Sequence, residues 1–399
     1  MKIQVCRRYG YMQADNERGD VRPCGWTSIS SCGNLLKDNV QTIFNGEAMR
    51  KLHQSMIDGS YRYCRREACR FLANETLLDK FGMWIDTDDP LQWPTEWSLS
   101  FEQQCNYRCT VCGVKLNHGK KEDSQEMDII RDRLTEALPH ARIVGGNGTA
   151  ELFCSPRILS MLSQWEPEDP EHAVVELETN GSLFTEANWN KISNIGKYHF
   201  ILHITIMSFE DTTYRYLSGT SMPVENVIKN LRLAKRLREQ GVINHLELAT
   251  VVQEANFRTL PEFTRRCLEE FGADSVRLRP FFPNFCQPRH INWFWDIRNP
   301  EHPYFSEYQK VMEHPIIKHP KVEITSGDIL SSIGTFEQYT GLVPKSQCAP
   351  APKCTPAAVS PAELSDVQKR LEDIQNSVSF KVGRGITFLP RKLRDLVKK

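Results

Sequence analysis

The sequence predicts an α/β fold built on a parallel sheet that curls toward a barrel. Between about residue 95 and about residue 285, apolar runs typical of strands alternate with amphipathic segments typical of helices. The strand-like runs are residues 97–101, 142–144, 174–177, 200–206, 246–252 and 276–282. The helix-like segments between them include residues 156–165, 224–240 and 260–271. Six β–α units with short right-handed crossovers imply parallel strands, whose carboxyl ends gather ligands.

The length of 399 residues is typical of a folded protein with two or three domains. Its 50 basic residues balance 50 acidic residues, so no global charge indicates a nucleic-acid partner. The first residues lack the apolar core of a signal peptide, and no stretch is long and apolar enough for a membrane span. Thirteen cysteines in such a chain favour metal binding in a reducing compartment over disulfides. We therefore expect a cytoplasmic protein.

Three cysteines, Cys105, Cys109 and Cys112, follow the first strand-like run. Three thiolates can hold three corners of a cubane iron–sulfur cluster and leave one iron open to an outside ligand. On a helix the same spacing would place three core thiols on one face, but the strand pattern of residues 97–101 runs directly into Cys105. Zinc is the other alternative, with His118 as the nearest candidate for a fourth ligand.

This cysteine run resembles the signature of the radical SAM superfamily. In that family the open iron binds S-adenosylmethionine, and an electron from the cluster cleaves this cofactor to a 5′-deoxyadenosyl radical. The resemblance implies a partial (β/α)6 TIM-like barrel, a catalytic [4Fe-4S] cluster on Cys105, Cys109 and Cys112, and an electron donor such as flavodoxin or ferredoxin. One residue departs from the pattern, because Val111 stands where relatives often have an aromatic residue.

The region after the second strand is similar to the family's Gly-Gly-Glu motif, which holds the amino group of S-adenosylmethionine. Glycines let the backbone approach a ligand, and a carboxylate can bind an ammonium group. Two registers are open. Either Glu151 is the family glutamate, which we favour, or Gly145 and Gly146 are the glycine pair and Asn147 replaces the glutamate. Gly148 lies between the two and is a further candidate contact.

Later strands add further candidates. Asn180 belongs to a Thr-Asn-Gly sequence that many relatives have at this place, although Asn-Gly is also an ordinary turn. Thr205 stands in the fourth strand, where relatives have a serine or threonine that helps to bind S-adenosylmethionine. Arg277 and Arg279 share one side of the sixth strand, where they bind an anionic group or pair with acidic neighbours.

A second cysteine set lies in the first 92 residues and consists of Cys6, Cys24, Cys64 and Cys69. This segment resembles the SPASM or twitch auxiliary module, although such modules usually follow the barrel. Four cysteines can close one cluster completely, which suits electron relay. Cys32 is either a replacement ligand or a buried thiol, and a structural zinc site is the alternative for the whole set.

The predicted organisation has five parts: an auxiliary cluster module (1–92), a radical SAM core barrel (93–290), a barrel extension (291–342), a linker (343–362) and a basic amphipathic tail (363–399). Cys286 is a candidate hydrogen-atom donor, as in some radical SAM epimerases, with a structural thiol as the alternative. Residues 380–399 contain seven basic residues and one acid. Such a tail is solvated, or contacts an anionic membrane surface or a partner.

These features together predict a radical SAM iron–sulfur oxidoreductase that abstracts a hydrogen atom from its substrate. The auxiliary module favours a peptide or protein substrate. The tail, which resembles tails of some bacterial glycosyltransferases of surface polysaccharide pathways, favours a sugar or glycan. Oxidation, epimerisation and cross-linking are all compatible with the residues. The alternative is a catalytically inactive iron–sulfur or zinc-binding scaffold.

Overall fold

The structure is a computed structural model that describes residues 1–66, 69, 72, 82–113, 125–146, 148–282 and 288–324. The chain divides into two compact units, Met1–Leu342 and Val343–Lys399. The second unit, with the predicted linker and basic tail, lies outside the described residues. Within the described ranges, no helix has both the length and the apolar character needed to cross a membrane.

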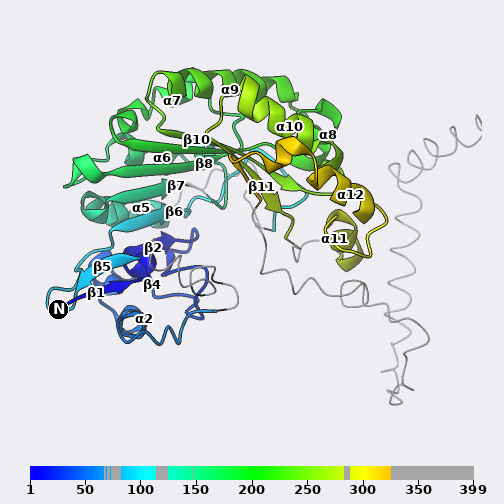
Figure 1. The fold of residues 1–399 in the computed structure, drawn as a ribbon. Coiled ribbons are helices and arrows are strands. Elements are labelled where there is room, and N and C mark those ends of the chain that lie inside the picture. The colour runs from blue at the N-terminus through cyan, green and yellow to red at the C-terminus, as the bar shows by residue number, and fades with distance from the viewer. Residues whose placement is uncertain are drawn as a thin grey trace, which may run out of the picture. The chain divides into compact units, whose positions relative to one another are not determined.

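A ten-stranded sheet organises the first unit, with the strand order β12-β11-β10-β9-β8-β7-β6-β2-β3-β4 (Figure 1). Its strands are β2 (Tyr11–Ala14), β3 (Asp20–Arg22), β4 (Gly33–Asn34), β6 (Glu96–Leu99), β7 (Ile143–Gly146), β8 (Val174–Thr179), β9 (His199–Thr205), β10 (His245–Val252), β11 (Ser275–Pro280) and β12 (Val322–Ile324). The strands from β6 to β11 pair in parallel in chain order. The predicted α/β fold with a mostly parallel sheet is therefore confirmed, whereas its curvature into a partial barrel stays a prediction.

Strand β8 shows why the sheet has two different faces. Val175 and Leu177 are fully buried, and Leu177 lies on the side of Ile158 in the covering helix α6 (Pro156–Ser163). Because side chains alternate along a strand, Glu176 and Glu178 point to the opposite face. The sheet therefore has an apolar face against the helices and a second face that carries charged groups.

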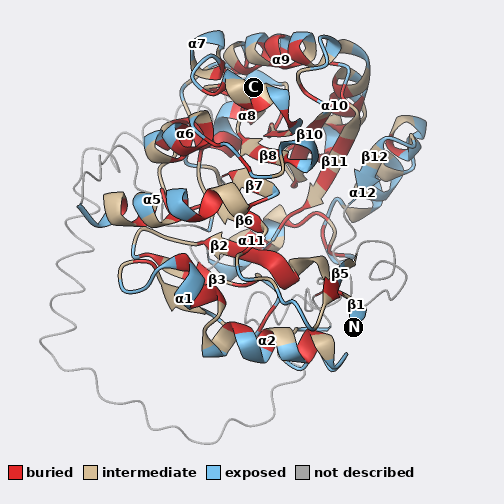
Figure 2. Cartoon of the chain, turned by 90° about the vertical axis from the view of Figure 1, so that its left-hand side faces the viewer, coloured by how far each residue is buried: buried red, intermediate tan, exposed pale blue. Residues whose placement is uncertain are grey.

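The helices follow from apolar residues spaced for one buried face. They are α1 (Val40–Phe44), α2 (Glu47–Ile57), α5 (Gln125–Ala137), α6, α7 (Glu186–Trp189), α8 (Asp211–Ser218), α9 (Val224–Glu239), α10 (Leu260–Arg265), α11 (Arg289–Trp295) and α12 (Phe305–Met312). The predicted segments 156–165 and 224–240 match α6 and α9, and 260–271 matches α10 with the π-helical turn Arg266–Glu270. Buried residues follow the strands and the helix sides that face them (Figure 2).

The N-terminal segment extends the main sheet. Strand β2 pairs in parallel with β6, and β3 and β4 continue the sheet from there. Met12 and Ala14 of β2 are buried and join the same apolar core as Trp97 and Leu99 of β6. Strands β1 (Lys2–Val5) and β5 (Met83–Asp86) form a separate antiparallel pair. The segment predicted as an auxiliary module is thus joined to the core through shared strands.

Candidate functional site

The three-cysteine loop follows β6 and is held against the end of helix α8. The backbone N–H of Arg108 donates to the carbonyl of Ser218 at 3.0 Å, and that of Thr110 donates to the carbonyl of Leu217 at 2.9 Å. Gly219, which ends α8, has a φ of 58°, and a Cβ there would lie 2.2 Å from the carbonyl oxygen of Arg108. Only glycine therefore allows this close approach, which fixes the loop.

The thiols of this loop lie close enough to influence one another. Burial raises the pKa of Cys109, and the nearby charges of Cys105 and Cys112 raise it further. Burial likewise raises the pKa of Cys105 to about 11, despite a hydrogen bond from the backbone of Tyr107. Mutual repulsion of this kind is relieved when thiolates bind a metal, which requires their deprotonated form. The donor set therefore suits an iron–sulfur cluster.

Among the described residues, no group of three histidine, cysteine, aspartate or glutamate side chains is placed to hold one metal ion. Zinc stays the alternative to an iron–sulfur cluster for these thiols. The alternative ligand His118 lies outside the described residues.

A cavity of about 310 Å³, which we call the thiol cavity, joins the three cysteines to several predicted cofactor contacts. Its polar and small lining residues include Cys105, Cys109, Cys112, Gly148, Thr149, Glu178, Thr179, Asn180, Thr205, Ser218 and Arg279. Three of the predicted contacts, Gly148, Asn180 and Thr205, thus line the same cavity as the thiols. They lie near the carboxyl ends of the strands, where ligands are expected.

Glu151 lines neither this cavity nor the neighbouring one. Its side chain is fully buried, and its carboxylate accepts hydrogen bonds from Thr179 Oγ1 at 2.6 Å, from the backbone N–H of Asn180 at 2.7 Å and from the backbone N–H of Phe153 at 3.2 Å. Burial raises the pKa of this carboxyl, and the three hydrogen bonds oppose the rise. In this structure Glu151 holds the turn that follows β8, and its predicted contact with the cofactor stays a prediction.

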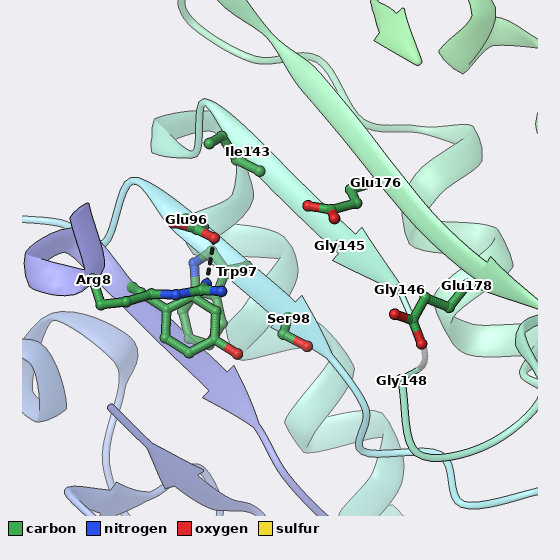
Figure 3. A pocket seen from close by; sticks show the side chains of 11 residues that line it. Arg8, Glu96, Trp97, Ser98, Ile143, Gly145, Gly146, Gly148, Glu176 and Glu178 are labelled. Carbon is green, nitrogen blue, oxygen red and sulfur yellow. Dashed lines mark hydrogen bonds and ion pairs between the residues drawn. The ribbon is translucent and has the colours of Figure 1, made fainter. Parts of the chain in front are cut away.

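The other glycines of the predicted motif, Gly145 and Gly146, line a second cavity of about 150 Å³, which we call the glutamate cavity (Figure 3). It lies between the N-terminal segment and strands β6 to β8, and it is also lined by Arg8, Tyr11, Glu96, Trp97, Ser98, Ile143, Gly148, Glu176 and Glu178. Gly148 and Glu178 line both cavities, so the two are neighbours. Asn147, the alternative to Glu151, lies outside the described residues.

A chain of ion pairs crosses the charged face of the sheet. Nε2 of His203 lies 3.0 Å from Oε1 of Glu176, and its Nδ1 lies 3.0 Å from Oε1 of the buried Glu247. Burial alone would lower the pKa of His203, but the two carboxylates outweigh it and raise this pKa to about 9. His203 is therefore an imidazolium at neutral pH.

The two arginines of β11 extend this chain. Arg277 lies 2.6 Å from Glu247 and 3.0 Å from Glu323, so it pairs with acidic neighbours. Arg279 lies 3.5 Å from Glu178 and 3.6 Å from Glu247, and it also lines the thiol cavity. Of the two alternatives stated for these arginines, the structure shows acidic pairing for both, and it places Arg279 at the wall of the thiol cavity.

The four N-terminal cysteines gather in one place. Burial raises the pKa of Cys6 to about 11 and that of Cys64 to about 12. The nearby charges of Cys24 and Cys69 add to both shifts. Cys32 stands apart, since its thiol donates to the carbonyl of Val21 at 3.3 Å and burial alone raises its pKa to about 12. The four predicted auxiliary ligands therefore lie near one another, and their binding of a cluster stays a prediction.

Sequence reasoning missed several residues of the site. Glu176 and Glu178 stand in a strand whose alternation of apolar and acidic residues was a usable signal. Arg8 and Cys154 carried no such signal. Burial, the charge of Glu151 and the charge of Cys105 raise the pKa of Cys154 to about 12, so Cys154 lies near the cysteine loop. Cys286, the candidate hydrogen-atom donor, lies outside the described residues.

Comparisons with known proteins give structural likenesses only. No protein-family model matches the chain, and no curated protein sequence matches it. Among solved structures, the chain is similar to Streptococcus suis SuiB bound to S-adenosylmethionine, with 12% identity and a TM-score of 0.40. The match covers 58% of this chain and 50% of SuiB, so the chain spans about half the length of that protein.

Two further similar structures are named as enzymes. A radical SAM methyltransferase from Sphaerobacter thermophilus has 16% identity over 63% of this chain and 74% of its own, with a TM-score of 0.33. Methylornithine synthase (PylB) has 15% identity over 69% of this chain and 80% of its own, with a TM-score of 0.38. Of the three similar structures, the one from Sphaerobacter thermophilus is named as a radical SAM enzyme.

Proposed function

We propose that this protein is a radical SAM enzyme whose catalytic cluster is held by Cys105, Cys109 and Cys112. The observation that carries the proposal is the thiol cavity, which these cysteines share with Gly148, Asn180 and Thr205. When bound there, the cluster and S-adenosylmethionine would supply a 5′-deoxyadenosyl radical that takes a hydrogen atom from the substrate. The protein's own part is to position both groups and to limit access of water.

The residues around the thiol cavity have distinct tasks in this proposal. The side chain of Asn180 donates to Asn106 at 2.9 Å, which ties the turn after β8 to the cysteine loop. Gly148 leaves room for a ligand to approach the backbone. Arg279 and Glu178 offer opposite charges at the cavity wall. Such a pair suits the carboxylate and ammonium groups of S-adenosylmethionine.

The N-terminal cysteines support a second, auxiliary cluster as part of the same proposal. Arg8 connects this set to the glutamate cavity, because its backbone N–H donates to the Cys6 thiol and its guanidinium lines the cavity. An electron leaving a substrate bound in that cavity would therefore have a cluster close by. Transfer of an electron from a substrate radical to a nearby cluster suits oxidation of a peptide, protein, sugar or glycan, with flavodoxin or ferredoxin as the external electron donor.

Formation of 5′-deoxyadenosine tests the proposed activity. The full chain, purified without oxygen and reconstituted with iron and sulfide, is incubated with dithionite and S-adenosylmethionine, and the product is quantified by mass spectrometry. We expect turnover that is lost in Cys105→Ala and kept in Cys32→Ala, whose thiol stands apart from both cysteine sets. Equal amounts from the native chain and Cys105→Ala would contradict the proposal and favour an inactive metal-binding scaffold.

A further inference from the structure

The side chain of Asn106 joins the cysteine loop to the turn that follows β8. Asn106 comes directly after Cys105, and the turn begins at Asn180. Nδ2 of Asn106 donates to Oγ of Ser182 at 2.8 Å, and Oδ1 of Asn106 accepts from Nδ2 of Asn180 at 2.9 Å. Both ends of this amide are therefore engaged by the turn. Asn106 is not among the described residues that line the thiol cavity.

A third hydrogen bond closes these contacts into a ring. Oγ of Ser182 donates to Oδ1 of Asn180 at 2.5 Å, and the backbone N–H of Ser182 donates to the same oxygen at 2.9 Å. Each side chain thus donates to the next one, in the order Asn106, Ser182, Asn180 and back to Asn106. Hydrogen bonds arranged in this way polarise and strengthen one another. We call these three residues the Asn–Ser ring.

The turn that carries two members of the ring is held by other parts of the fold. The backbone N–H of Asn180 donates to the buried carboxylate of Glu151 at 2.7 Å. Nδ2 of Asn230, on α9, donates to the carbonyl groups of Gly181 at 2.8 Å and Ser182 at 2.9 Å. The turn is therefore a firm support to which the Asn–Ser ring attaches the loop.

The Asn–Ser ring holds one flank of Cys105. On the other flank, the carbonyl of Gln104 accepts from the backbone N–H of Glu151 at 2.9 Å. The later part of the loop is held separately, by the two backbone bonds to the end of α8 described above. Loss of the ring would therefore loosen the loop at Cys105 and leave its attachment to α8 in place.

The ring uses most of the hydrogen-bonding capacity of the Asn180 side chain. An amide oxygen has two acceptor sites and an amide nitrogen has two N–H groups. Both acceptor sites of Asn180 are filled by Ser182, and one N–H is bound to Asn106. A single N–H is left for the direct cofactor contact that the sequence predicts for Asn180. Position, more than direct contact, is what this side chain supplies.

We propose that Asn106 is a positioning residue for the radical reaction, and that Asn180 acts on cofactor binding through Asn106. The inference rests on the proposed function in one respect, which is that Cys105 holds the catalytic cluster. A loop that is already held at Cys105 needs no further ordering when the cofactor binds, and such preorganisation tightens binding. The Asn–Ser ring thereby joins the place of the cluster to β8, whose Glu178 and Thr179 line the same cavity.

Hydrogen–deuterium exchange of the full chain without metal or cofactor tests the ring itself. In Asn106→Ala, the slowest amide of residues 104–108 should exchange about tenfold faster, since two side-chain bonds are lost. Asn106→Asp should keep the native rate, because a carboxylate at this position accepts from both Asn180 and Ser182. Asn190→Ala removes an exposed asparagine elsewhere and is the matched control. Native exchange in Asn106→Ala would overturn the inference.

Binding of S-adenosylmethionine to the reconstituted chain tests the functional step. It is followed by the change that a ligand on the open iron causes in the electron paramagnetic resonance spectrum of the cluster. We expect Asn106→Ala and Asn180→Ala to weaken binding about tenfold each, and the double variant to bind no more weakly than either one. Weaker binding in Asn180→Ala with native binding in Asn106→Ala would mean direct contact and would overturn the inference, as would losses that multiply in the double variant.

Two controls keep these results distinct. If Asn106→Ala has a lowered melting temperature, Ser182→Ala takes its place, because it removes the same bond from the side of the turn. A native chain whose spectrum does not respond to S-adenosylmethionine contradicts the proposed function, and the Asn–Ser ring is then an element of the fold alone. A native chain that responds, with variants that bind equally well, contradicts only the positioning role of Asn106.

Discussion

The carboxylate of Glu151 accepts a 2.6 Å hydrogen bond from the hydroxyl of Thr179, at the end of strand β8. Its other oxygen accepts from the backbone N–H of Asn180 at 2.7 Å. One fully buried carboxylate thus fixes the residue that ties the turn to the cysteine loop. The arrangement of the residues around the thiol cavity therefore depends on Glu151, whose side chain does not line that cavity.

Removing this carboxylate should destabilise the protein. We expect Glu151→Ala to lower the free energy of unfolding by about 3 kcal/mol, because the Thr179 hydroxyl and the Asn180 N–H are left buried without their acceptor. Urea denaturation followed by circular dichroism measures the change, with the exposed Glu166→Ala as the matched control. A loss no larger than that of the control would show that the turn does not depend on Glu151.

The ion pairs of His203 are the second test of stability. His203→Leu should lower the free energy of unfolding by about 3–5 kcal/mol, since it leaves the buried Glu247 without one of its cationic partners. His172 pairs with Asp169 at 2.9 Å on the surface, so His172→Leu is the control and should cost under about 1 kcal/mol. Similar losses in the two variants would mean that the buried chain of charges adds nothing.

The same histidine predicts a pH dependence. Its pKa of about 9 in the folded protein exceeds the ordinary histidine value of 6.5, so the folded state binds the proton more tightly. The stabilisation is fully present below pH 6.5 and is lost as the pH rises through 9. The difference in unfolding free energy between the native chain and His203→Leu should shrink across this window. A constant difference from pH 6 to pH 10 would contradict the prediction.

Periodicity predicted the strands of the parallel sheet because each one buries an apolar face. In β8 the apolar residues Val175 and Leu177 alternate with glutamates, and this pattern is visible without a structure. The pairing of β2 with β6 is different, since it joins residues more than 80 positions apart and has no local signal. Pairing of this kind depends on the whole core, to which Met12 contributes.

The candidate site likewise has residues that the sequence predicts and residues that it does not. The spacing of Cys105, Cys109 and Cys112 was enough to predict that they act together, because seven residues of chain cannot separate them far. The orientation of Glu151 was not predictable, since it depends on Thr179, 28 residues later. The same limit applied to Cys32, whose distance from the other N-terminal thiols follows from its place beside Val21.

Iron content tests both cysteine sets in one experiment. The reconstituted chain should contain about eight iron atoms if each set holds a four-iron cluster. Replacing Cys105, Cys109 and Cys112 by alanine should remove about half of this iron, and replacing Cys6, Cys24 and Cys64 should remove the other half.

Cys32→Ala is the matched control for iron content, and it should leave the iron unchanged, because the thiol of Cys32 bonds to Val21 apart from the others. Inductively coupled plasma mass spectrometry measures iron and zinc in the same sample. If zinc replaces the iron that depends on Cys6, Cys24 and Cys64, the N-terminal set is a structural zinc site. An electron that leaves a substrate in the glutamate cavity would then have no nearby acceptor.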